Sequence, residues 1–462
     1  MSIINSLVSI VGKDNILTKS FDREIYSYDS SPYSAVPLAV VFPKTTEETA
    51  QVVQACAEAG VAVTPRGAGT CLSGGAITSE NGILISMTKM DKILNIDLEQ
   101  ELALVEPGVV NYSLQEALEP HGYFFAPDPS SFRVATLGGN TGENAGGIKG
   151  VKYGVTKNHI LGLEVVLPDG EVINTGKLAP QKGIDLKIDL TNLFCGSEGT
   201  LGIVTKILVN ITKKPEAVKT MLVTFNQLEE AGNLVANILK AGIIPTTLEI
   251  MDKTVTRAVE DYLQLGLPKD VEAMLLVEVD GTPDEVESRS AKIIELFKRF
   301  EVNSFQVAKD DNERNNLWKA RRSANGALGK LKSAYMVQDV VVPINKLTKM
   351  LTAVTEIGKK YNIIIGQVAH AGDGNLHPHL LYDHDNHEEK ERAEEASAEI
   401  FRETINLEGT LSGEHGIGME KLPYMGWAFN EQELEFKRSL KESLDPTWQF
   451  NRGKLISAKK EG

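Results

Sequence analysis

Residues 65–76 read PRGAGTCLSGGA and directly follow a short apolar run at residues 61–64. Eight of the twelve residues are Gly, Ala, Ser or Thr, and only Arg66 and Leu72 carry bulky side chains. A loop of this kind leaves backbone N–H groups open and can hold a pyrophosphate. It is neither a Walker A loop, since the Lys-Ser/Thr pair is missing, nor a Rossmann fingerprint, since position 72 is Leu. Taken alone, the loop fits a phosphate cradle and an irregular surface turn equally well.

Two further segments share this glycine-rich texture. Residues 136–147 read TLGGNTGENAGG, and residues 195–204 read CGSEGTLGIV. Glycine at this density costs conformational entropy on folding, so it needs a compensating reason. A large flat ligand that the backbone approaches closely would explain the glycines of all three segments at once. The alternative is that each segment is an independent tight turn, which requires three separate explanations. The sequence therefore predicts a binding site for such a ligand in one domain.

The composition limits the class of protein. The chain has 462 residues, 42% of them hydrophobic, which suggests two or three packing units of globular type. Its 48 Lys and Arg against 63 Asp and Glu give a net charge of −15 without a basic block, so nucleic acid is not an expected partner. Three cysteines are too few for a cubane iron–sulfur cluster or a disulfide framework, and reduced thiols suggest a cytoplasmic setting. We find neither a basic leader nor an apolar run near the ~18 residues of a transmembrane segment.

The pattern of elements changes near residue 215. Before it, short strands alternate with glycine-rich loops. An amphipathic helix begins at the capping box formed by Thr45 and Glu48 and ends at Gly60. Residues 168–171, PDGE, predict a hairpin turn.

After residue 215 the order strand–helix–strand occurs twice, over residues 221–251 and 274–308. This order predicts an α+β sheet with helices on one face. The charged residues 383–402 predict a solvated helix.

Six of the eight histidines lie between residues 370 and 415. Residues 370–379 read HAGDGNLHPH, in which Gly-Asp-Gly-Asn is a turn signal after an apolar strand. We expect a hairpin that brings His370 near His377 across the two strands. His379 follows His377 by two residues and falls on the same face.

A second element of this cluster, GEHGIG at residues 413–418, supplies Glu414 and His415. The set His370, His377 and Glu414 is a sound ligand set for an open divalent metal site, whose free positions could hold a substrate's carboxylate and hydroxyl. The identity of the metal does not follow. Two histidines among Asp and Glu are expected to be solvated surface residues: His384 and His387.

Four segments together resemble the FAD-binding domain of the vanillyl-alcohol oxidase type: RGAGT at 66–70, GGN at 138–140, NAGG at 144–147 and GSEGTLG at 196–202. Within this superfamily the chain resembles, over nearly its whole length, the D-2-hydroxyacid dehydrogenases, which include D-lactate dehydrogenase and the glycolate oxidase catalytic subunit. The resemblance implies an α+β fold. A PCMH-type FAD-binding domain of two α/β subdomains would be joined to a cap domain with an antiparallel sheet covered by helices.

The resemblance also implies the domain limits. The FAD-binding domain is expected at residues 1–215 and the substrate-binding cap at residues 216–425. Residues 426–462 are expected to return to the FAD domain.

The resemblance implies that the first loop binds the FAD pyrophosphate and that the other two segments line the isoalloxazine and the adenine-ribose. Some relatives attach the flavin through a His in or near the first loop. No His lies between residues 1 and 120 here, so we expect non-covalent FAD. Cys71 departs from the family, in which Gly is common. The cofactor-binding residues implied by the resemblance are Arg66, Gly67, Ala68, Gly69, Thr70, Ser73, Gly74, Thr136, Gly138, Gly139, Asn140, Asn144, Ala145, Glu198, Gly199, Ile203 and Asn451.

The same resemblance assigns roles to the histidine cluster. His415 is the expected catalytic base, and an imidazole has a suitable pKa near neutrality for taking the hydroxyl proton. A divalent ion, Zn, Fe or Mn, is expected at His370, His377 and Glu414. Two further residues are expected to contact the substrate: Asn375 and His379.

Residues 317–322, LWKARR, predict a helix on which adjacent side chains point ~100° apart, so only one arginine can face a site. The family's Trp-x-x-Arg pattern selects Arg321 as the bidentate anchor of the substrate carboxylate and leaves Arg322 outside. The alternative is that both are solvated. Relatives specific for a dicarboxylate have a Lys before the Asp-Val-x-x-Pro run, and residues 335–343, YMVQDVVVP, have none. A small monocarboxylate such as lactate is therefore expected.

These assignments predict an FAD-dependent oxidoreductase that oxidises D-lactate to pyruvate by hydride transfer to FAD. The chain has no cluster-binding cysteines and no haem-attachment motif, so the electrons are expected to pass to a partner, an electron-transfer flavoprotein or an iron–sulfur subunit. The alternatives are a glycolate oxidase catalytic subunit, an aryl-alcohol or amine oxidase on the same fold, a metal-dependent hydrolase, and a non-catalytic flavoprotein.

Overall fold

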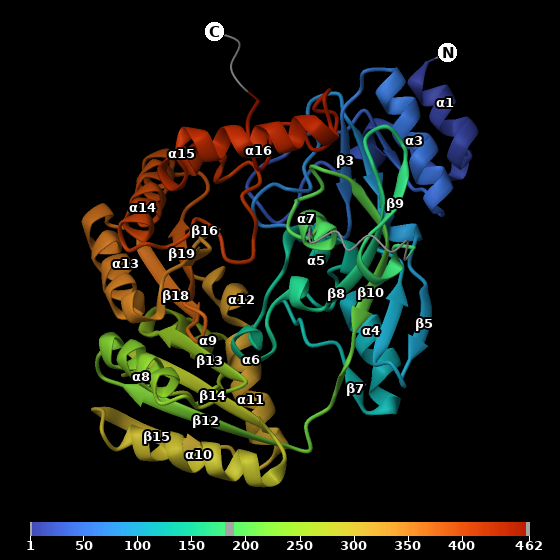
Figure 1. The fold of residues 1–462 in the computed structure, drawn as a ribbon. Coiled ribbons are helices and arrows are strands. Elements are labelled where there is room, and N and C mark those ends of the chain that lie inside the picture. The colour runs from blue at the N-terminus through green and yellow to red at the C-terminus, as the bar shows by residue number, and fades with distance from the viewer. Residues whose placement is uncertain (1, 181–188, 459–462) are drawn as a thin grey trace. The chain divides into compact units, whose positions relative to one another are not determined.

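The computed structural model describes residues 2–180 and 189–458, and the chain forms two compact units (Figure 1). The first unit contains Met1–Gly146, Val155–Lys214 and Glu414–Gly462, so it is built from both ends of the chain. The second contains Gly147–Gly154 and Pro215–Gly413. Each unit has its own sheets and its own apolar core.

One part of the first unit is a four-stranded sheet. Its strand order is β1 (Ile16–Leu17), β2 (Ala39–Val41), β4 (Ile83–Ser86) and β3 (Val63–Arg66), and the last three are parallel. The helices α1 (Ile3–Val11) and α3 (Thr46–Glu58) share one core with these strands. This is the first α/β subdomain that the sequence predicts.

Helix α3 shows how the sequence sets its boundaries. Thr45 caps the helix, since its side-chain oxygen accepts a hydrogen bond from the N–H of Glu48 at 3.1 Å. The carboxylate of Glu48 reaches the N–H of Lys44 at 2.7 Å, one residue before the one that a capping box requires. Gly60 follows with a φ of +65°, which ends the helix. The predicted helix is confirmed, and only half of the predicted box forms.

The other part of the first unit is a five-stranded antiparallel sheet. Its order is β5 (Ile93–Asp97), β6 (Leu102–Val105), β10 (Ile203–Asn210), β8 (Ile160–Val166) and β9 (Val172–Asn174). The helices α4 (Asn111–Leu118) and α5 (Leu137–Glu143) contribute to its core. The β8–β9 hairpin contains Gly170 at a φ of +84°, which confirms the predicted turn.

The C-terminal residues belong to the first unit. After α15 (Met425–Ala428) and α16 (Glu431–Leu444), Phe450 pairs in parallel with Val63 of β3. The N–H of Val63 donates to the carbonyl of Gln449 at 2.9 Å, and the N–H of Asn451 donates to the carbonyl of Val63 at 2.8 Å. The end of the chain is therefore hydrogen-bonded to the strand from which the first glycine-rich loop leaves.

The second unit is built on one antiparallel sheet. Its path is β15 (Val302–Val307), β12 (Ala217–Phe225), β14 (Ala273–Gly281), β13 (Thr247–Asp252), β18 (Ile364–His370), β19 (Asn375–Tyr382) and β16 (Ala334–Val337), with β17 (Val340–Val341) also paired to β19. The two predicted strand–helix–strand units are confirmed as β12–α8–β13 and β14–α10–β15.

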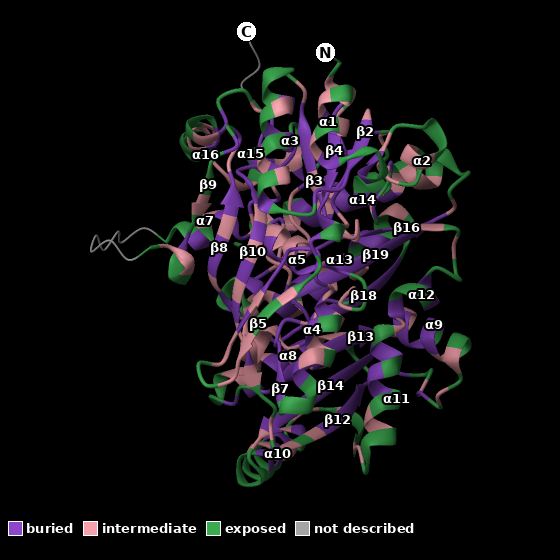
Figure 2. Ribbon diagram, turned by 90° about the vertical axis from the view of Figure 1, so that its right-hand side faces the viewer, coloured by how far each residue is buried: buried purple, intermediate pink, exposed green. Residues whose placement is uncertain are grey.

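Helices cover both faces of this sheet, contrary to the predicted single face (Figure 1). One face carries α8 (Leu228–Lys240), α10 (Pro283–Phe297), α13 (Leu347–Tyr361) and α14 (His387–Asn406). The other carries α9 (Lys253–Leu263), α11 (Asp311–Arg322) and α12 (Ala324–Leu328). The reason lies in β14, whose residues are almost all buried whichever way they point, as Figure 2 shows.

Helix α14 also differs from its prediction. It starts at His387 and packs one side into the unit through Ala393, Ala396, Ile400 and Phe401, which are buried. Its many charges lie on the remaining surface, so it is an amphipathic helix. Across residues 2–180 and 189–458, no helix has the length and apolar character needed to cross a bilayer.

Candidate flavin and substrate sites

The first glycine-rich segment forms the loop after β3. Arg66 closes the loop, since its Nη1 donates to the carbonyl of Ala76 at 3.3 Å. A Cβ on Gly67 would overlap Oγ1 of Thr136, and Gly69 has a φ of +75°. Glycine is needed at the first position because the loop packs against the start of α5, and at the second because of the left-handed backbone.

The second segment forms α5 and its cap. Thr136 accepts a hydrogen bond from the N–H of Gly139 at 3.3 Å. Asn140 is 3% exposed, and its Nδ2 has no hydrogen-bond partner among the described residues. A buried donor left unpaired costs about 1–3 kcal/mol, which a ligand with carbonyl or phosphate oxygens would recover. FAD carries both kinds of oxygen, so the residues present fit this cofactor.

The third segment holds a loop that comes from the C-terminal part of the chain. The carboxylate of Glu198 accepts hydrogen bonds from the consecutive N–H groups of Ile417 and Gly418, both at 2.7 Å. Glu198 is 5% exposed and has a φ of +52°, so its backbone is also constrained. The two hydrogen bonds fix the turn that follows His415.

Asn451 joins the first and third segments. Its Nδ2 donates to the carbonyls of Gly75, at 3.1 Å, and Glu198, at 2.6 Å. The Nζ of Lys454 donates to the Gly75 carbonyl at 2.9 Å and to Oδ1 of Asn451 at 2.7 Å. Burial lowers the pKa of Lys454 to about 8. A direct contact of Asn451 with the flavin stays a prediction, since its amide already serves two carbonyls.

The expected base, His415, is anchored to the first glycine-rich loop through its backbone. Oγ of Ser73 donates to the His415 carbonyl at 2.9 Å, and the Ser73 carbonyl accepts from the N–H of Met419 at 2.8 Å. The structure therefore places His415 in the same unit as every residue that the resemblance assigns to FAD.

Three groups in or near the first glycine-rich loop have a raised pKa: Glu143, Glu198 and Cys71. Burial raises the pKa of Glu143 and of Glu198, and the charge of Glu198 raises the pKa of Glu143 further. Burial also raises the pKa of the Cys71 thiol well above its usual value. The sulfur accepts hydrogen bonds from the N–H groups of Ser73 and Gly75 at 3.4 and 3.2 Å. Cys71 is therefore a neutral thiol that shapes the turn.

In the second unit, the predicted histidine hairpin is confirmed. Strands β18 and β19 pair with His370 opposite Asn375 and with Val368 opposite His377. The ring centroids of His370 and His377 are 5.0 Å apart, with 83° between the ring planes. His379 lies on the same face, as its spacing predicts.

A carboxylate that sequence reasoning missed connects two of the predicted residues. Oε1 of Glu249 lies 2.6 Å from Nδ1 of His370, and Oε2 accepts a hydrogen bond from Nε of Arg321 at 2.6 Å. Glu249 is 1% exposed and stands opposite His370 in the register of β13 and β18. The only signal in the sequence was one Glu within a buried strand.

A second missed carboxylate, Asp339, lies on the β19 side of the hairpin, near the same turn. Oδ1 accepts from Nδ2 of Asn375 at 3.0 Å, while Oδ2 accepts from Oγ of Ser412 at 2.7 Å and from the N–H of Gly413 at 2.9 Å. Oδ1 of Asn375 is buried without a hydrogen-bond partner among the described residues. This amide oxygen offers an acceptor to a substrate hydroxyl.

The remaining predicted residues have their own contacts. Nδ1 of His379 lies 2.8 Å from the carbonyl of His377, and Nε2 lies 2.9 Å from Oδ1 of Asn325. Arg321 is buried, while Arg322 is exposed with its guanidinium 6.0 Å from the ring of Trp318. The expectation that one arginine points inward and the other outward is confirmed.

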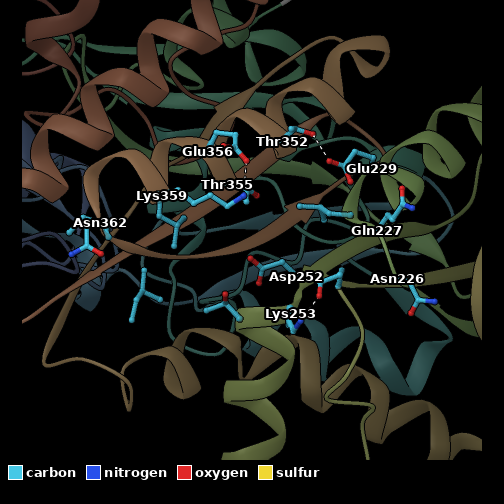
Figure 3. Close-up of a pocket in the computed structure, with 17 residues that line it drawn as sticks. Asn226, Gln227, Glu229, Asp252, Lys253, Thr352, Thr355, Glu356, Lys359 and Asn362 are labelled. Atoms are coloured by element: carbon cyan, nitrogen blue, oxygen red, sulfur yellow. Dashed lines mark hydrogen bonds and ion pairs between the residues drawn. The ribbon is translucent and has the colours of Figure 1, made fainter.

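A surface pocket of about 560 Å³ lies elsewhere in the second unit, between the N-termini of α8 and α9 and the C-terminal half of α13 (Figure 3). Its charged side chains are Glu229, Asp252, Lys253, Glu272, Glu356 and Lys359. Burial raises the pKa of Asp252 to about 7. None of the predicted site residues lines this pocket.

Comparison with protein families agrees with this fold. A family model described as FAD linked oxidases, C-terminal domain, matches residues 214–455, and an FAD binding domain model matches residues 37–176. The chain belongs to the FAD-linked oxidases and is an FAD-dependent oxidoreductase. These two matches contradict the alternative that the chain as a whole is a metal-dependent hydrolase.

The chain is also similar to individual proteins over most of its length. The chain is 42% identical to glycolate oxidase subunit GlcD of Bacillus subtilis (strain 168), over 98% of this chain and 96% of the relative. It is 33% identical to D-lactate dehydrogenase of Anaerostipes hadrus, over 91% of this chain and 90% of the relative. A solved structure of p-cresol methylhydroxylase with substrate bound has a TM-score of 0.81 at 17% identity, covering 100% of this chain and 97% of that chain. That likeness confirms the predicted PCMH-type fold.

Proposed function

We propose that this protein oxidises a short 2-hydroxy monocarboxylate, glycolate or D-lactate, to the 2-oxo acid with non-covalent FAD as the hydride acceptor. The names of the two relatives support this class of substrate. The observation that carries the proposal is the buried connection from Arg321 through Glu249 to His370. It joins a guanidinium suited to a carboxylate with an imidazole suited to a metal ion.

Arg321 is proposed to bind the substrate carboxylate. Its Nε is held by Glu249, and its two terminal nitrogens make no hydrogen bond with any residue in the described ranges. A guanidinium fixed at Nε offers those two nitrogens in a rigid fork that matches a carboxylate. Residues 335–343 contain no Lys for a second carboxylate, which supports a monocarboxylate.

His370, His377 and Glu414 are proposed to hold a divalent ion, Zn, Fe or Mn. Nδ1 of His370 lies 2.6 Å from a carboxylate oxygen of Glu249, and metal-bound histidines usually donate their second ring nitrogen to such a group. Glu414 directly follows Gly413, whose N–H is held by Asp339. When bound, such an ion lowers the pKa of a substrate hydroxyl.

His415 is proposed to take the hydroxyl proton while the hydride leaves the α-carbon for FAD, so the substrate loses two electrons and two hydrogens. Asn375 and His379 are proposed to contact the substrate. The residues assigned to FAD by resemblance, from Arg66 to Asn451, are proposed to hold the cofactor. The reduced flavin would pass its electrons to an electron-transfer flavoprotein or an iron–sulfur subunit in the cytoplasm. Three cysteines are too few to hold a cubane iron–sulfur cluster within this chain, which supports an acceptor on another protein.

The test is an anaerobic visible spectrum of the purified protein before and after the addition of glycolate, D-lactate and L-lactate in separate cuvettes. Bleaching of the flavin band by glycolate or D-lactate, and not by L-lactate, is the expected result. The acid that reduces the flavin faster identifies the preferred substrate. A flavin band that none of the three acids bleaches would overturn the proposal and favour the non-catalytic flavoprotein.

A further inference from the structure

We propose that Glu249 is a positioning residue that couples the substrate anchor to the metal ligand set; this inference rests on the proposed function above. Glu249 lies in the middle of β13 and uses both carboxylate oxygens, one toward His370 and one toward Arg321. The side chains involved are 1% to 6% exposed. One carboxylate therefore determines the orientation of two groups that have different tasks.

The effect on His370 follows from the acceptor character of a carboxylate. A carboxylate oxygen 2.6 Å from Nδ1 favours the tautomer that donates from Nδ1, and the contact fixes the orientation of the ring. A ligand histidine without such a partner can rotate or take the other tautomer. Loss of this kind of partner typically weakens metal affinity 10–100-fold.

The effect on Arg321 follows from geometry and charge. Glu249 neutralises the buried guanidinium and fixes it at Nε, which sets the plane of the two terminal nitrogens. A glutamine in its place offers one oxygen acceptor and one NH₂ group. The single oxygen of a glutamine can accept a hydrogen bond from either His370 or Arg321. The N–H group of the other residue then faces the glutamine NH₂ group, which is also a donor.

The same sheet face provides a matched control in Glu278 of β14. Glu278 is 2% exposed and accepts from Nε and Nη2 of Arg314, at 2.8 and 2.9 Å, and from Nε1 of Trp318 at 2.7 Å. It is thus a second buried glutamate paired with an arginine of α11, but it does not contact a proposed metal ligand. Substitution of Glu278 reproduces the cost of disturbing a buried ion pair without touching His370.

The experiment compares the wild-type holoenzyme with Glu249→Gln and Glu278→Gln. Each protein is stripped of metal by a chelator with its FAD retained and is titrated with Mn²⁺, and the free ion is followed by electron paramagnetic resonance. We expect Mn²⁺ to bind Glu249→Gln at least tenfold more weakly than wild type, and Glu278→Gln within threefold of wild type. A second readout is the binding of oxalate to the metal-free proteins, monitored by the flavin spectrum, which we expect to weaken only in Glu249→Gln.

The outcomes separate this inference from the proposed function. Equal Mn²⁺ and oxalate affinities in wild type and Glu249→Gln would overturn the role of Glu249 alone. A wild-type protein that binds no Mn²⁺, although glycolate or D-lactate bleaches its flavin, would overturn the metal role and this inference and leave the oxidation standing. If Glu249→Gln does not fold, Glu249→Asp takes its place, because a carboxylate shortened by one methylene cannot reach both partners. Wild-type affinities in Glu249→Asp would overturn the inference.

Discussion

The carboxylate of Asp339 accepts a hydrogen bond from the backbone N–H of Gly413, with 2.9 Å between Oδ2 and N. Asp339 is fully buried and also accepts from Ser412 and from the side chain of Asn375. One side chain thus fixes the start of β19 and the backbone immediately before Glu414.

Substitution of this residue is expected to be costly. Asp339→Asn offers one acceptor oxygen where three donors now bind, so at least one buried donor loses its partner at about 1–3 kcal/mol. We expect a lower melting temperature and weaker Mn²⁺ binding. Thermal denaturation and metal titration measure the two effects, and Asp385→Asn, at an exposed position, serves as the control. Equal behaviour of the two variants would contradict the positioning role.

The base assignment predicts a specific loss in His415→Ala. The variant keeps the carbonyl that accepts from Ser73, so FAD should be retained. Anaerobic flavin reduction by the substrate should slow by about 10²–10⁴-fold, the usual contribution of general-base catalysis. Stopped-flow spectroscopy measures this rate. Reduction at the wild-type rate would exclude His415 as the base.

The metal assignment predicts that His370→Ala loses bound metal and substrate-dependent flavin reduction together. Elemental analysis of the purified variant measures the first, and the flavin spectrum the second. His384→Ala is the control, because His384 is exposed and outside the proposed ligand set. Full metal content in His370→Ala would show that the ion binds elsewhere or not at all.

The link between the glycine-rich segments can be tested at Asn451. This residue has a φ of +46°, so alanine would add backbone strain, whereas Asn451→Gly removes the side chain without that strain. The carbonyls of Gly75 and Glu198 would lose a donor. We expect the variant to release FAD during gel filtration and to melt at a lower temperature. Unchanged FAD content would contradict the linking role.

The buried Asp252 predicts a pH dependence of stability. Burial raises its pKa from 3.8 to about 7, and the charge of Glu272 contributes in the same direction. Between these values the folded protein holds a proton that the unfolded chain has released. The free energy of unfolding therefore falls as the pH rises, by an amount on the order of a few kcal/mol.

Asp252→Asn cannot ionise and keeps an acceptor for the N–H of Val255 at the start of α9. Its melting temperature relative to wild type should be higher at pH 8 than at pH 4.5. A difference that does not change with pH would show that Asp252 is ionised throughout.

Local patterns predicted much of the fold. The hairpin that joins His370 and His377 follows from a turn signal after an apolar strand. Helical spacing predicted that only one of Arg321 and Arg322 points inward, and the family's Trp-x-x-Arg pattern selected Arg321. Glu249 could not be found in this way, because its partners lie 72 and 121 positions further along the chain. A single acidic residue in a buried strand indicates that its carboxylate has a hydrogen-bonding partner, but the sequence pattern does not identify which residue that partner is. The helices on the second face of the large sheet were missed for a related reason, since a strand that is apolar on both sides has no alternation to read.

The order in which the chain is synthesised gives the C-terminal hydrogen bonds a further meaning. A ribosome releases β3 and all three glycine-rich segments long before it releases Gln449, Phe450 and Asn451, which complete the pairing with Val63. Nearly the whole second unit emerges in between. Val63 therefore gains its last hydrogen-bond partners only after the residues of the second unit have been synthesised, so the first unit completes its sheet after the second unit has emerged.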